Sequence, residues 1–508
     1  MGFYDAIKNE LDNETKLTEN GAVAYRTSGK KLLDLNFAVA SLRSASEQTI
    51  INKFMDAYWE NQTLAIKWLF YNRDIRQGLG ERRSFRVILK HLANEHSKMI
   101  EGLIPLVSEY GRFDDLWCLF DTAYRPNVIK EISVQLEKDK VNMNQNKPIS
   151  LISKWLKSEN SSSAETKRLA KIIRTGLDMS SKEYRKMLSV MRKYIDVVER
   201  KMSAKEWNAI NYETVPSRAN LIYNNAFLRN DEERRRAYLG ALEKGEVKIN
   251  ASTLFPHDIV HKYMSGSSWC QSLKAYDATL EGLWKALPDT VKGAENTIVV
   301  ADGSGSMTCN VGGNTRVTAL DVANALAIYF AERSSGEFKD KYITFSNRPQ
   351  LVDFSKAATL RDKLQIALRH NEVADTNIEA TFDLILQTAI NNNMSQEDMP
   401  KNILIVSDME FNSAVGWHKP NETLFTTIAK KYAAHGYLLP RLIFWNVNSR
   451  TGTIPVKENE LGVALVSGFS VNIVNMVMSN KLDPYECLLD VLNTERYKPI
   501  EDVVKEVI

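Results

Sequence analysis

One short segment carries residues whose types and spacing suit the binding of a metal ion. Asp302, Ser304 and Ser306 alternate with glycines directly after an apolar run, 296–301, that predicts a buried strand. In extended backbone, residues i, i+2 and i+4 point to the same side, so one carboxylate and two hydroxyls should converge beyond the strand. Oxygen ligands select a hard cation, Mg²⁺ first, with Mn²⁺ or Ca²⁺ as alternatives.

Two further oxygen donors lie where the same edge of a sheet should bring them. Thr376 opens a predicted helix, and Asp408 ends the strand predicted at 403–407. Ligand sites form at the carboxyl ends of parallel strands, so we predict that the segment 302–306 forms one metal site together with Thr376 and Asp408. Its ligands are Asp302, Ser304, Ser306, Thr376 and Asp408. Asp375 and Glu410 either add negative charge beside the ion, which weakens its attraction for an acidic partner, or are solvated loop carboxylates.

The elements that must position these residues alternate between strand and helix from Glu295 onward. Short apolar runs occur at 296–301, 342–345, 403–406, 442–447 and 463–466. Helical stretches separate them near 318–335, 377–392, 422–435 and 471–479. Such alternation is typical of a parallel sheet wrapped by helices, so we predict a doubly wound α/β domain at 291–508.

The preceding part of the chain has helical periodicity instead. From about Ser46 to Leu287, apolar residues recur at helical spacing, and the S-x-x-E spacing at Ser162, Ser180 and Ser203 predicts helix starts. We predict an all-α domain at 46–290, built from helical pairs stacked as a HEAT-like solenoid without a clean repeat. Residues 1–45 show little periodicity and are interpreted as an N-terminal arm.

Composition narrows the class of protein. The 508 residues are 44 % apolar and 25 % charged, as in ordinary globular domains. The four cysteines form no C-x-x-C pair, which fits a reducing compartment. Neither a signal peptide nor an apolar run of roughly 18 residues occurs, so we expect a cytoplasmic protein without a membrane partner.

Basic residues give a second candidate surface. Residues 1–290 hold 45 Lys and Arg against 37 Asp and Glu, a net +8, whereas 291–508 hold 21 against 26, a net −5. We predict a stripe along one helix that could neutralise RNA phosphates: Lys182, Arg185, Lys186, Lys193 and Arg200. Further basic clusters lie at 167–174 and 234–236. The alternative is a solvated basic face.

Enzyme motifs are missing from the sequence. It contains no G-x-x-x-x-G-K-[ST], G-x-G-x-x-G or H-E-x-x-H pattern, and the serine of 303–305 follows an aspartate and a glycine rather than forming a nucleophile elbow. We therefore expect a non-enzymatic protein without a nucleotide cofactor.

The D-x-S-x-S segment with Thr376 and Asp408 resembles the metal-ion-dependent adhesion site of von Willebrand factor A domains, over residues 295 to about 490. By that resemblance, Ser304, Ser306 and Thr376 hold the ion through hydroxyls. Asp302 and Asp408 would hold it directly or through water. One position stays open for an oxygen of a partner.

The N-terminal half resembles the helical-repeat (TROVE) module of the Ro ribonucleoprotein autoantigen at 73–82 and 110–116. Segments 182–186, 215–218 and 463–469 are similar to Ro-related proteins in which such a module is fused to an A domain. The resemblance implies a helical solenoid or ring that binds small or single-stranded RNA, joined to a Mg²⁺-dependent A domain that captures a ligand oxygen. The alternative function is a protein–protein adaptor, in which the helical half is a scaffold and the metal site binds an acidic residue of a partner.

Overall fold

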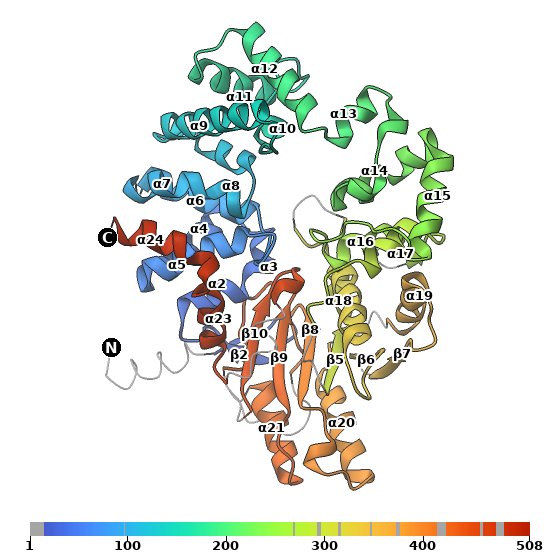
Figure 1. The fold of residues 1–508 in the computed structure, drawn as a ribbon. Helices are drawn as coiled ribbons and strands as arrows, with labels where there is room; N and C mark the ends of the chain where they lie inside the picture. Colours follow the sequence, from blue (N-terminus) through green and yellow to red (C-terminus); the bar gives the residue numbers. More distant parts are fainter. Residues whose placement is uncertain are drawn as a thin grey trace, which may run out of the picture. The chain divides into compact units, whose positions relative to one another are not determined.

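The computed structural model describes residues 15–95, 97–267, 270–291, 296–312, 316–345, 348–371, 376–413, 423–457, 461–473 and 482–507. The chain divides into two compact units, each built from two separate stretches of sequence. The sheet unit comprises residues 1–60 and 251–492, and the helical unit comprises 61–250 and 493–508. The predicted combination of an all-α region with an α/β region is confirmed (Figure 1).

The sheet unit contains a six-stranded sheet in the order β10-β9-β8-β5-β6-β7. Its strands are β5 (Thr297–Asp302), β6 (Lys341–Phe345), β7 (Gln350–Asp353), β8 (Asn402–Ser407), β9 (Arg441–Asn446) and β10 (Val463–Ser467). Neighbouring strands are parallel, except that β7 is antiparallel to β6. Every residue of β5, β9 and β10 is buried, so both faces of the central sheet are covered. The five predicted strands are confirmed.

Helices of the sheet unit pack around this sheet. They are α2 (Lys31–Phe37), α3 (Val39–Leu42), α4 (Glu47–Glu60), α16 (Pro256–Tyr263), α17 (Ala278–Lys285), α18 (Ala319–Arg333), α19 (Leu360–His370), α20 (Glu379–Asn391), α21 (Leu424–Ala434) and α23 (Pro484–Leu492). Helix α18 contacts β5, β6 and β8, and all its residues from Ala319 to Ala331 are buried. A capping box between Thr318 and Asp321 starts α18 and fixes the loop that leads out of β5. Most of the predicted helix at 471–479 lies outside the described residues.

The two compact units differ from the predicted domains at residues 15–60, 251–290 and 493–508. Residues 15–45 are no arm, because the hairpin of β1 (Thr15–Leu17) and β2 (Val23–Tyr25) and helix α2 belong to the sheet unit. Helix α2 buries Leu32, Leu35 and Phe37 and contacts β10 and α23. Residues 251–290 also belong to the sheet unit, and 493–508 to the helical unit. Helical periodicity shows that a helix has a buried face, but it does not show which core buries it.

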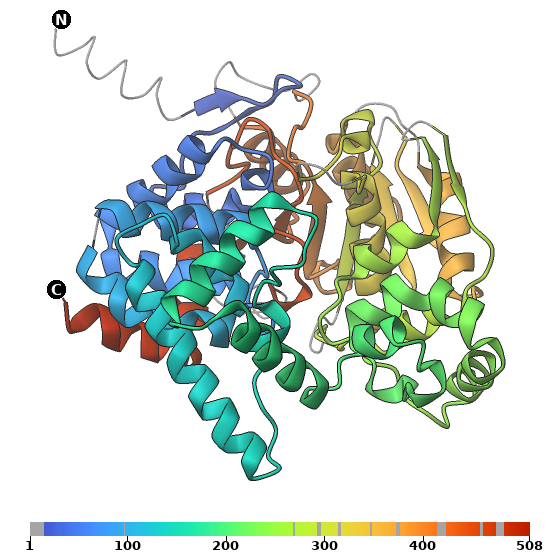
Figure 2. The same ribbon diagram turned by 90° about the horizontal axis from the view of Figure 1, so that it is seen from above.

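The helical unit consists of short amphipathic helices. They are α5 (Gln62–Arg73), α6 (Arg83–Glu95), α7 (Ser97–Leu103), α8 (Val107–Tyr110), α9 (Arg125–Asn144), α10 (Ile152–Trp155), α11 (Ala164–Gly176), α12 (Ser181–Tyr194), α13 (Val198–Ser203), α14 (Ser217–Asn230), α15 (Glu232–Glu243) and α24 (Lys498–Lys505). Helix α24 lies against α5 and α7, although about 400 residues separate them (Figure 2).

Only one of the three predicted helix starts has the expected cap. Ser180 and Glu183 form the capping box of α12. Helix α11 is capped instead by Ser163, one residue later than predicted, whose hydroxyl accepts from the N–H of Thr166. Ser203 ends α13 rather than starting a helix. The hydroxyl–carboxylate spacing is therefore sufficient for a cap only where a helix follows.

A buried ion-pair network joins the motifs 73–82 and 110–116 in the helical unit. Arg73 Nε donates to Asp115 Oδ2 at 2.7 Å, and Arg86 Nε donates to Asp115 Oδ1 at 2.7 Å. Arg73 is 3 % exposed and Asp115 is fully buried. A Cβ at Gly111 would lie 2.5 Å from Asp115 Oδ2, so only glycine leaves room for the pair. The motifs are thus structural elements of this unit.

Candidate metal site

The loop after β5 places three of the predicted ligands. Strand β5 ends at Asp302, and a single 3-10 turn, Gly305–Thr308, turns the chain back over the strand end. Asp302 Oδ1 accepts from the N–H of Ser304 at 2.9 Å, and Oδ2 accepts from the hydroxyl of Ser407 at 2.5 Å. The Oγ atoms of Ser304 and Ser306 lie 3.0 Å apart. The segment therefore brings its carboxylate and hydroxyls together, as its spacing predicts.

Asp408 reaches the same place from the neighbouring strand. Strand β8 pairs in parallel with β5 and ends at Ser407, so Asp408 lies at the same carboxyl edge as Asp302. Burial raises the pKa of Asp302. Burial and the charge of Asp302 together raise the pKa of Asp408 to about 7, against the opposing effects of Ser306 and Arg450. Two buried carboxylates that raise one another's pKa are stabilised by a nearby cation.

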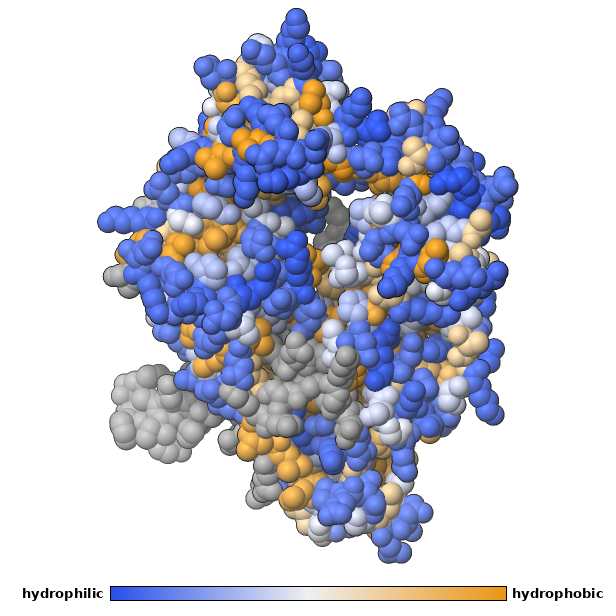
Figure 3. All heavy atoms as spheres, viewed as in Figure 1, coloured by the Kyte–Doolittle hydropathy of each residue, from blue (hydrophilic) through white to orange (hydrophobic). Residues whose placement is uncertain are grey.

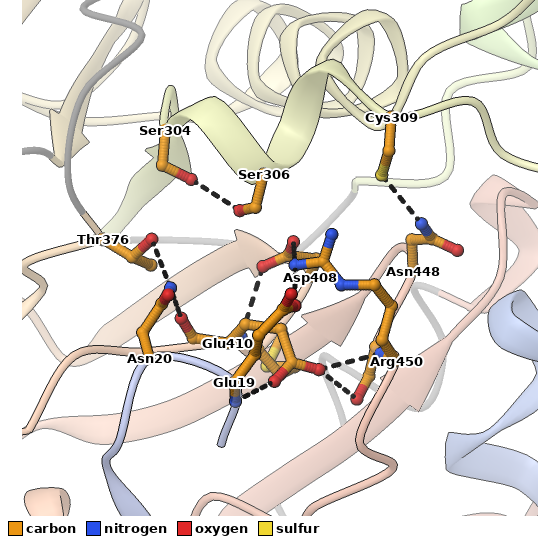
Figure 4. A network of polar contacts seen from close by, with 12 residues as sticks. Glu19, Asn20, Ser304, Ser306, Cys309, Thr376, Asp408, Glu410, Asn448 and Arg450 are labelled. Atoms are coloured by element: carbon orange, nitrogen blue, oxygen red, sulfur yellow. Dashed lines mark hydrogen bonds and ion pairs between the residues drawn. The ribbon is translucent and has the colours of Figure 1, made fainter.

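Thr376 lies on the other side of this cluster. Its side chain is buried, and its Oγ1 accepts from Asn20 Nδ2 at 3.2 Å. Figure 4 shows Thr376 below Ser304 and Asp408 below Ser306. All five predicted ligands therefore belong to one region of the sheet edge. Asp375 lies outside the described residues.

Glu410 is not the solvated loop carboxylate considered as one of its two roles, because it is fully buried. Its Oε1 accepts from the N–H groups of Arg450 at 2.8 Å and Thr451 at 2.9 Å. Its Oε2 accepts from the N–H of Glu19 at 2.8 Å. These partners use both oxygens of the carboxylate, so Glu410 anchors two loops beside the site.

Sequence reasoning missed three residues of this network: Glu19, Asn20 and Arg450. Arg450 Nη2 lies 3.3 Å from Asp408 Oδ2 and 2.5 Å from Glu19 Oε2, so one nitrogen contacts two carboxylates (Figure 4). Asn20 bridges Thr376 and the carbonyl of Glu410. More than 400 residues separate Glu19 from Arg450, and neither belongs to a recognisable motif, so no local signal could have paired them.

The donor set fits a hard divalent ion. It consists of two carboxylates and three hydroxyls, and such oxygen ligands suit Mg²⁺. Within the described part of the chain, no group of three or more His, Cys, Asp or Glu side chains is placed to hold a metal. Cys309 Sγ accepts from Asn448 Nδ2 at 3.1 Å, and burial raises the pKa of this thiol, which keeps it protonated.

Asp408 should make the stability of the metal-free protein depend on pH. Its pKa is 3.8 ordinarily and about 7 in the fold, so the folded chain holds a proton that the unfolded chain releases. The free energy of unfolding should therefore be highest below pH 4 for this group and fall as the pH rises to 7, by up to about 1.4 kcal/mol per pH unit. Urea unfolding with a chelator from pH 5 to 8 measures this fall. Asp408→Asn should flatten it, and identical slopes in both proteins would contradict the assignment.

The predicted basic stripe is only partly assembled. Lys182, Arg185, Lys186 and Lys193 are exposed on α12, where Arg185 Nε donates to the carbonyl of Ser181. Among the described residues, no hydrogen bond or ion pair involves the side chains of these three lysines. Arg200 lies on a different helix, α13, and pairs with Asp196 and Glu206. The prediction of one continuous helix was wrong because the chain turns between α12 and α13.

The other basic clusters are largely used in structural contacts. Arg168 pairs with Asp121 and Glu165, and Arg174 pairs with Glu159. Arg235 is fully buried against the rings of Tyr212, Phe227 and Tyr238. In Figure 3, hydrophilic side chains dominate the face over α11 and α12, with a few apolar side chains among them. The exposed lysines of α12, together with Lys167 and Lys171 of α11, are therefore the basic residues of these clusters that a ligand can reach.

Comparison with known proteins places the chain in a family. Residues 18–110 and 127–296, which together make up more than half of the chain, match the family described as Domain of unknown function (DUF2828). The chain belongs to the DUF2828 family. Residues 296–502 match a second family, Domain of unknown function (DUF7788). The border between the two DUF matches falls at the start of β5, inside the sheet unit.

A related protein matches both parts of this chain. "Uncharacterized protein L728" of Acanthamoeba polyphaga mimivirus is 30 % identical over 95 % of this chain and 88 % of the viral protein. The DUF2828 part and the sheet that follows it therefore occur together in a second protein. This agrees with the fold, in which DUF2828 residues supply helices α2, α3, α16 and α17 of the sheet unit.

Proposed function

We propose that this DUF2828 protein is a non-enzymatic binding protein, whose sheet-edge site holds Mg²⁺ and through it binds an acidic side chain of a partner protein. The observation that carries the proposal is the convergence of Asp302, Asp408 and three hydroxyls at the carboxyl ends of β5 and β8. The resemblance of this segment to the metal-ion-dependent adhesion site of von Willebrand factor A domains supports the proposal. In this proposal the helical unit is a scaffold.

The chain's own residues would divide the work at this site. Ser304, Ser306 and Thr376 would hold the ion through hydroxyls, and Asp302 and Asp408 would supply negative charge. A bound divalent ion supplies a positive charge that attracts an anionic oxygen. The two carboxylates supply two negative charges and the three hydroxyls none, so these five side chains add no excess negative charge that would repel an incoming carboxylate.

A peptide selection tests this function. The full chain, immobilised in Mg²⁺, is used to select from a random displayed library, and bound peptides are eluted with a chelator. The expected result is enrichment of peptides with Asp or Glu that fail to bind in chelator. Asp302→Asn serves as the matched control and should select none of them. Enrichment without acidic residues, or equal binding in chelator, would contradict the proposal.

A second candidate function, RNA binding by a Ro-like helical solenoid or ring, rests on α12. Lys182, Lys186 and Lys193 lie at i, i+4 and i+11, which places them on one exposed helix face. Contacts of this kind neutralise phosphates without reading sequence. The net charge of +8 over residues 1–290 also favours an anionic partner for this part of the chain.

Charge reversal of the three lysines tests RNA binding. Lys182→Glu, Lys186→Glu and Lys193→Glu together should lower affinity for every RNA by a similar factor. The slope of log affinity against log salt should fall by about two to three units, because each phosphate contact contributes roughly 0.7 to 0.9. Filter binding at several salt concentrations measures both. The buried residues Tyr184, Leu188 and Met191 lie on the other face, so the melting temperature should stay unchanged.

The matched control reverses the charge of three residues on α11 instead: Arg168→Glu, Lys171→Glu and Arg174→Glu. Two of these residues already have acidic partners, so their reversal should weaken RNA binding less. If the α12 variant binds RNA as tightly as the wild type, its three lysines are a solvated face and do not bind RNA.

A further inference from the structure

A turn from the N-terminal hairpin is fixed beside the candidate metal site. The turn, Thr18–Gly21, connects β1 and β2, and Thr18 Oγ1 donates to the carbonyl of Phe411 at 2.6 Å. The N–H of Glu19 donates to Glu410, and Asn20 Nδ2 donates to the carbonyl of Glu410 at 2.5 Å. These bonds attach the turn to the loop that follows Asp408. The backbone of Glu19 is therefore fixed relative to the site.

The side chain of Glu19 points into the same polar cluster as the predicted ligands (Figure 4). Its carboxylate contacts Arg450 Nη2, the nitrogen that also contacts Asp408. The next residue, Asn20, contacts the hydroxyl of Thr376. The side chain of Glu19 is 52 % exposed, so its carboxylate is free of a surrounding core and can change partner.

We propose that the Glu19 carboxylate exchanges Arg450 for the metal ion when the ion binds, and so becomes a ligand supplied by the chain itself at the position that would otherwise accept a partner's oxygen. In the ion-free arrangement, no three acidic side chains of the described residues are placed to hold a metal. This inference rests on the proposed function of the site. Glu19 has the carboxylate chemistry expected of the partner, and Arg450 links it to Asp408 as a cation would. An acidic partner must then displace Glu19, so the turn caps the site until a stronger carboxylate ligand arrives.

A simpler role for Glu19 would be to neutralise Arg450. In the wild-type background both roles predict that Glu19→Gln weakens metal binding, because an unneutralised guanidinium repels a divalent ion. When Arg450 is already uncharged, the neutralising role predicts only the modest loss of a nearby negative charge. Only the ligand role predicts in addition that a water molecule takes the place of the carboxylate on the ion. The decisive comparison is therefore between Arg450→Gln and the double variant Glu19→Gln/Arg450→Gln.

The experiment uses Mn²⁺, which accepts the same oxygen ligands as Mg²⁺ and is paramagnetic. Calorimetry on the full chain at pH 8 should show that Arg450→Gln raises Mn²⁺ affinity. Adding Glu19→Gln should then lower it by about 10- to 100-fold, because a charged ligand is lost. Water-proton relaxation should also increase in the double variant, since a water molecule replaces the carboxylate on the ion.

Controls separate the possible failures. Glu337→Gln, at an exposed glutamate of the same unit, should change neither readout in the Arg450→Gln background. Equal Mn²⁺ affinity and relaxation with and without Glu19→Gln, while Asp302→Asn still abolishes binding, would overturn the role of Glu19 alone. No Mn²⁺ binding in any variant would overturn both this role and the proposed function.

Discussion

Asp302→Asn should lower the affinity of the chain for Mg²⁺ by on the order of 100-fold or more while leaving the fold intact. Asp302 is 1 % exposed and supplies the carboxylate of the loop after β5, so its loss removes a charge from the ion's nearest surroundings. Asparagine keeps the shape and one oxygen, which can accept from the N–H of Ser304 in place of Oδ1, while its NH2 group would lie against the Ser407 hydroxyl. Calorimetric titration of chelator-treated protein with Mg²⁺ measures the change.

Thermal unfolding gives an independent readout of the same variant. Mg²⁺ at 100 times its dissociation constant should stabilise the wild type by about 2.7 kcal/mol and Asp302→Asn by almost nothing. In chelator the order should reverse, with the variant at least as stable, because it lacks one of two facing buried carboxylates. Asp56→Asn, an exposed position on α4, is the control. Unaltered Mg²⁺ affinity in Asp302→Asn would rule out the site.

Asp115→Ala should destabilise the helical unit by about 3–5 kcal/mol, the largest effect on stability expected of a single substitution here. Asp115 is fully buried and accepts from Arg73, Arg86 and the N–H of Arg112. The charges of Arg73 and Arg86 hold its pKa below the usual range despite burial. The substitution leaves the guanidinium of Arg73 buried without its partner.

Hydrogen exchange measures this loss where it should occur, in the amides of α5 and α6. A single unfolding midpoint is less suitable because the chain has two units. Asp121→Ala removes an exposed pair with Arg168, at 49 % exposure of the aspartate, and should cost about 0–1 kcal/mol. Similar exchange rates in α5 for Asp115→Ala and Asp121→Ala would contradict a structural role for the buried network.

Most strands of the sheet could be predicted because each depends on a short, local pattern of apolar residues. The apolar runs identified β5, β6, β8, β9 and β10, because strands buried on both faces are continuously apolar. Strand β7 was missed, since this short edge strand alternates exposed and buried residues over only four positions. The two-residue spacing of Asp302, Ser304 and Ser306 predicted the loop after β5 because side chains in extended backbone alternate.

Features that depend on pairing distant segments were not predictable from one sequence. The amphipathic pattern of α2 is real, but it does not indicate that β10 and α23 bury it. Likewise, the motifs at 73–82 and 110–116 were recognised only by resemblance, whereas their physical basis is the pair of Arg73 with Asp115. Glu19 and Arg450 meet only because the hairpin lies on the loop after β8.

The interleaving of the two units has a consequence for synthesis on the ribosome. Helix α2 and its neighbour α4 are made before the sheet, and β10 and α23, which α2 also contacts, are made more than 400 residues after α2. At a translation rate of about 5–20 residues per second, the apolar face of α2 remains without β10 for on the order of tens of seconds. The nascent chain should therefore depend on chaperones that bind exposed apolar segments. The helical unit likewise receives α24 more than 250 residues after α15, so neither unit can complete its core before residues 463–505 are made.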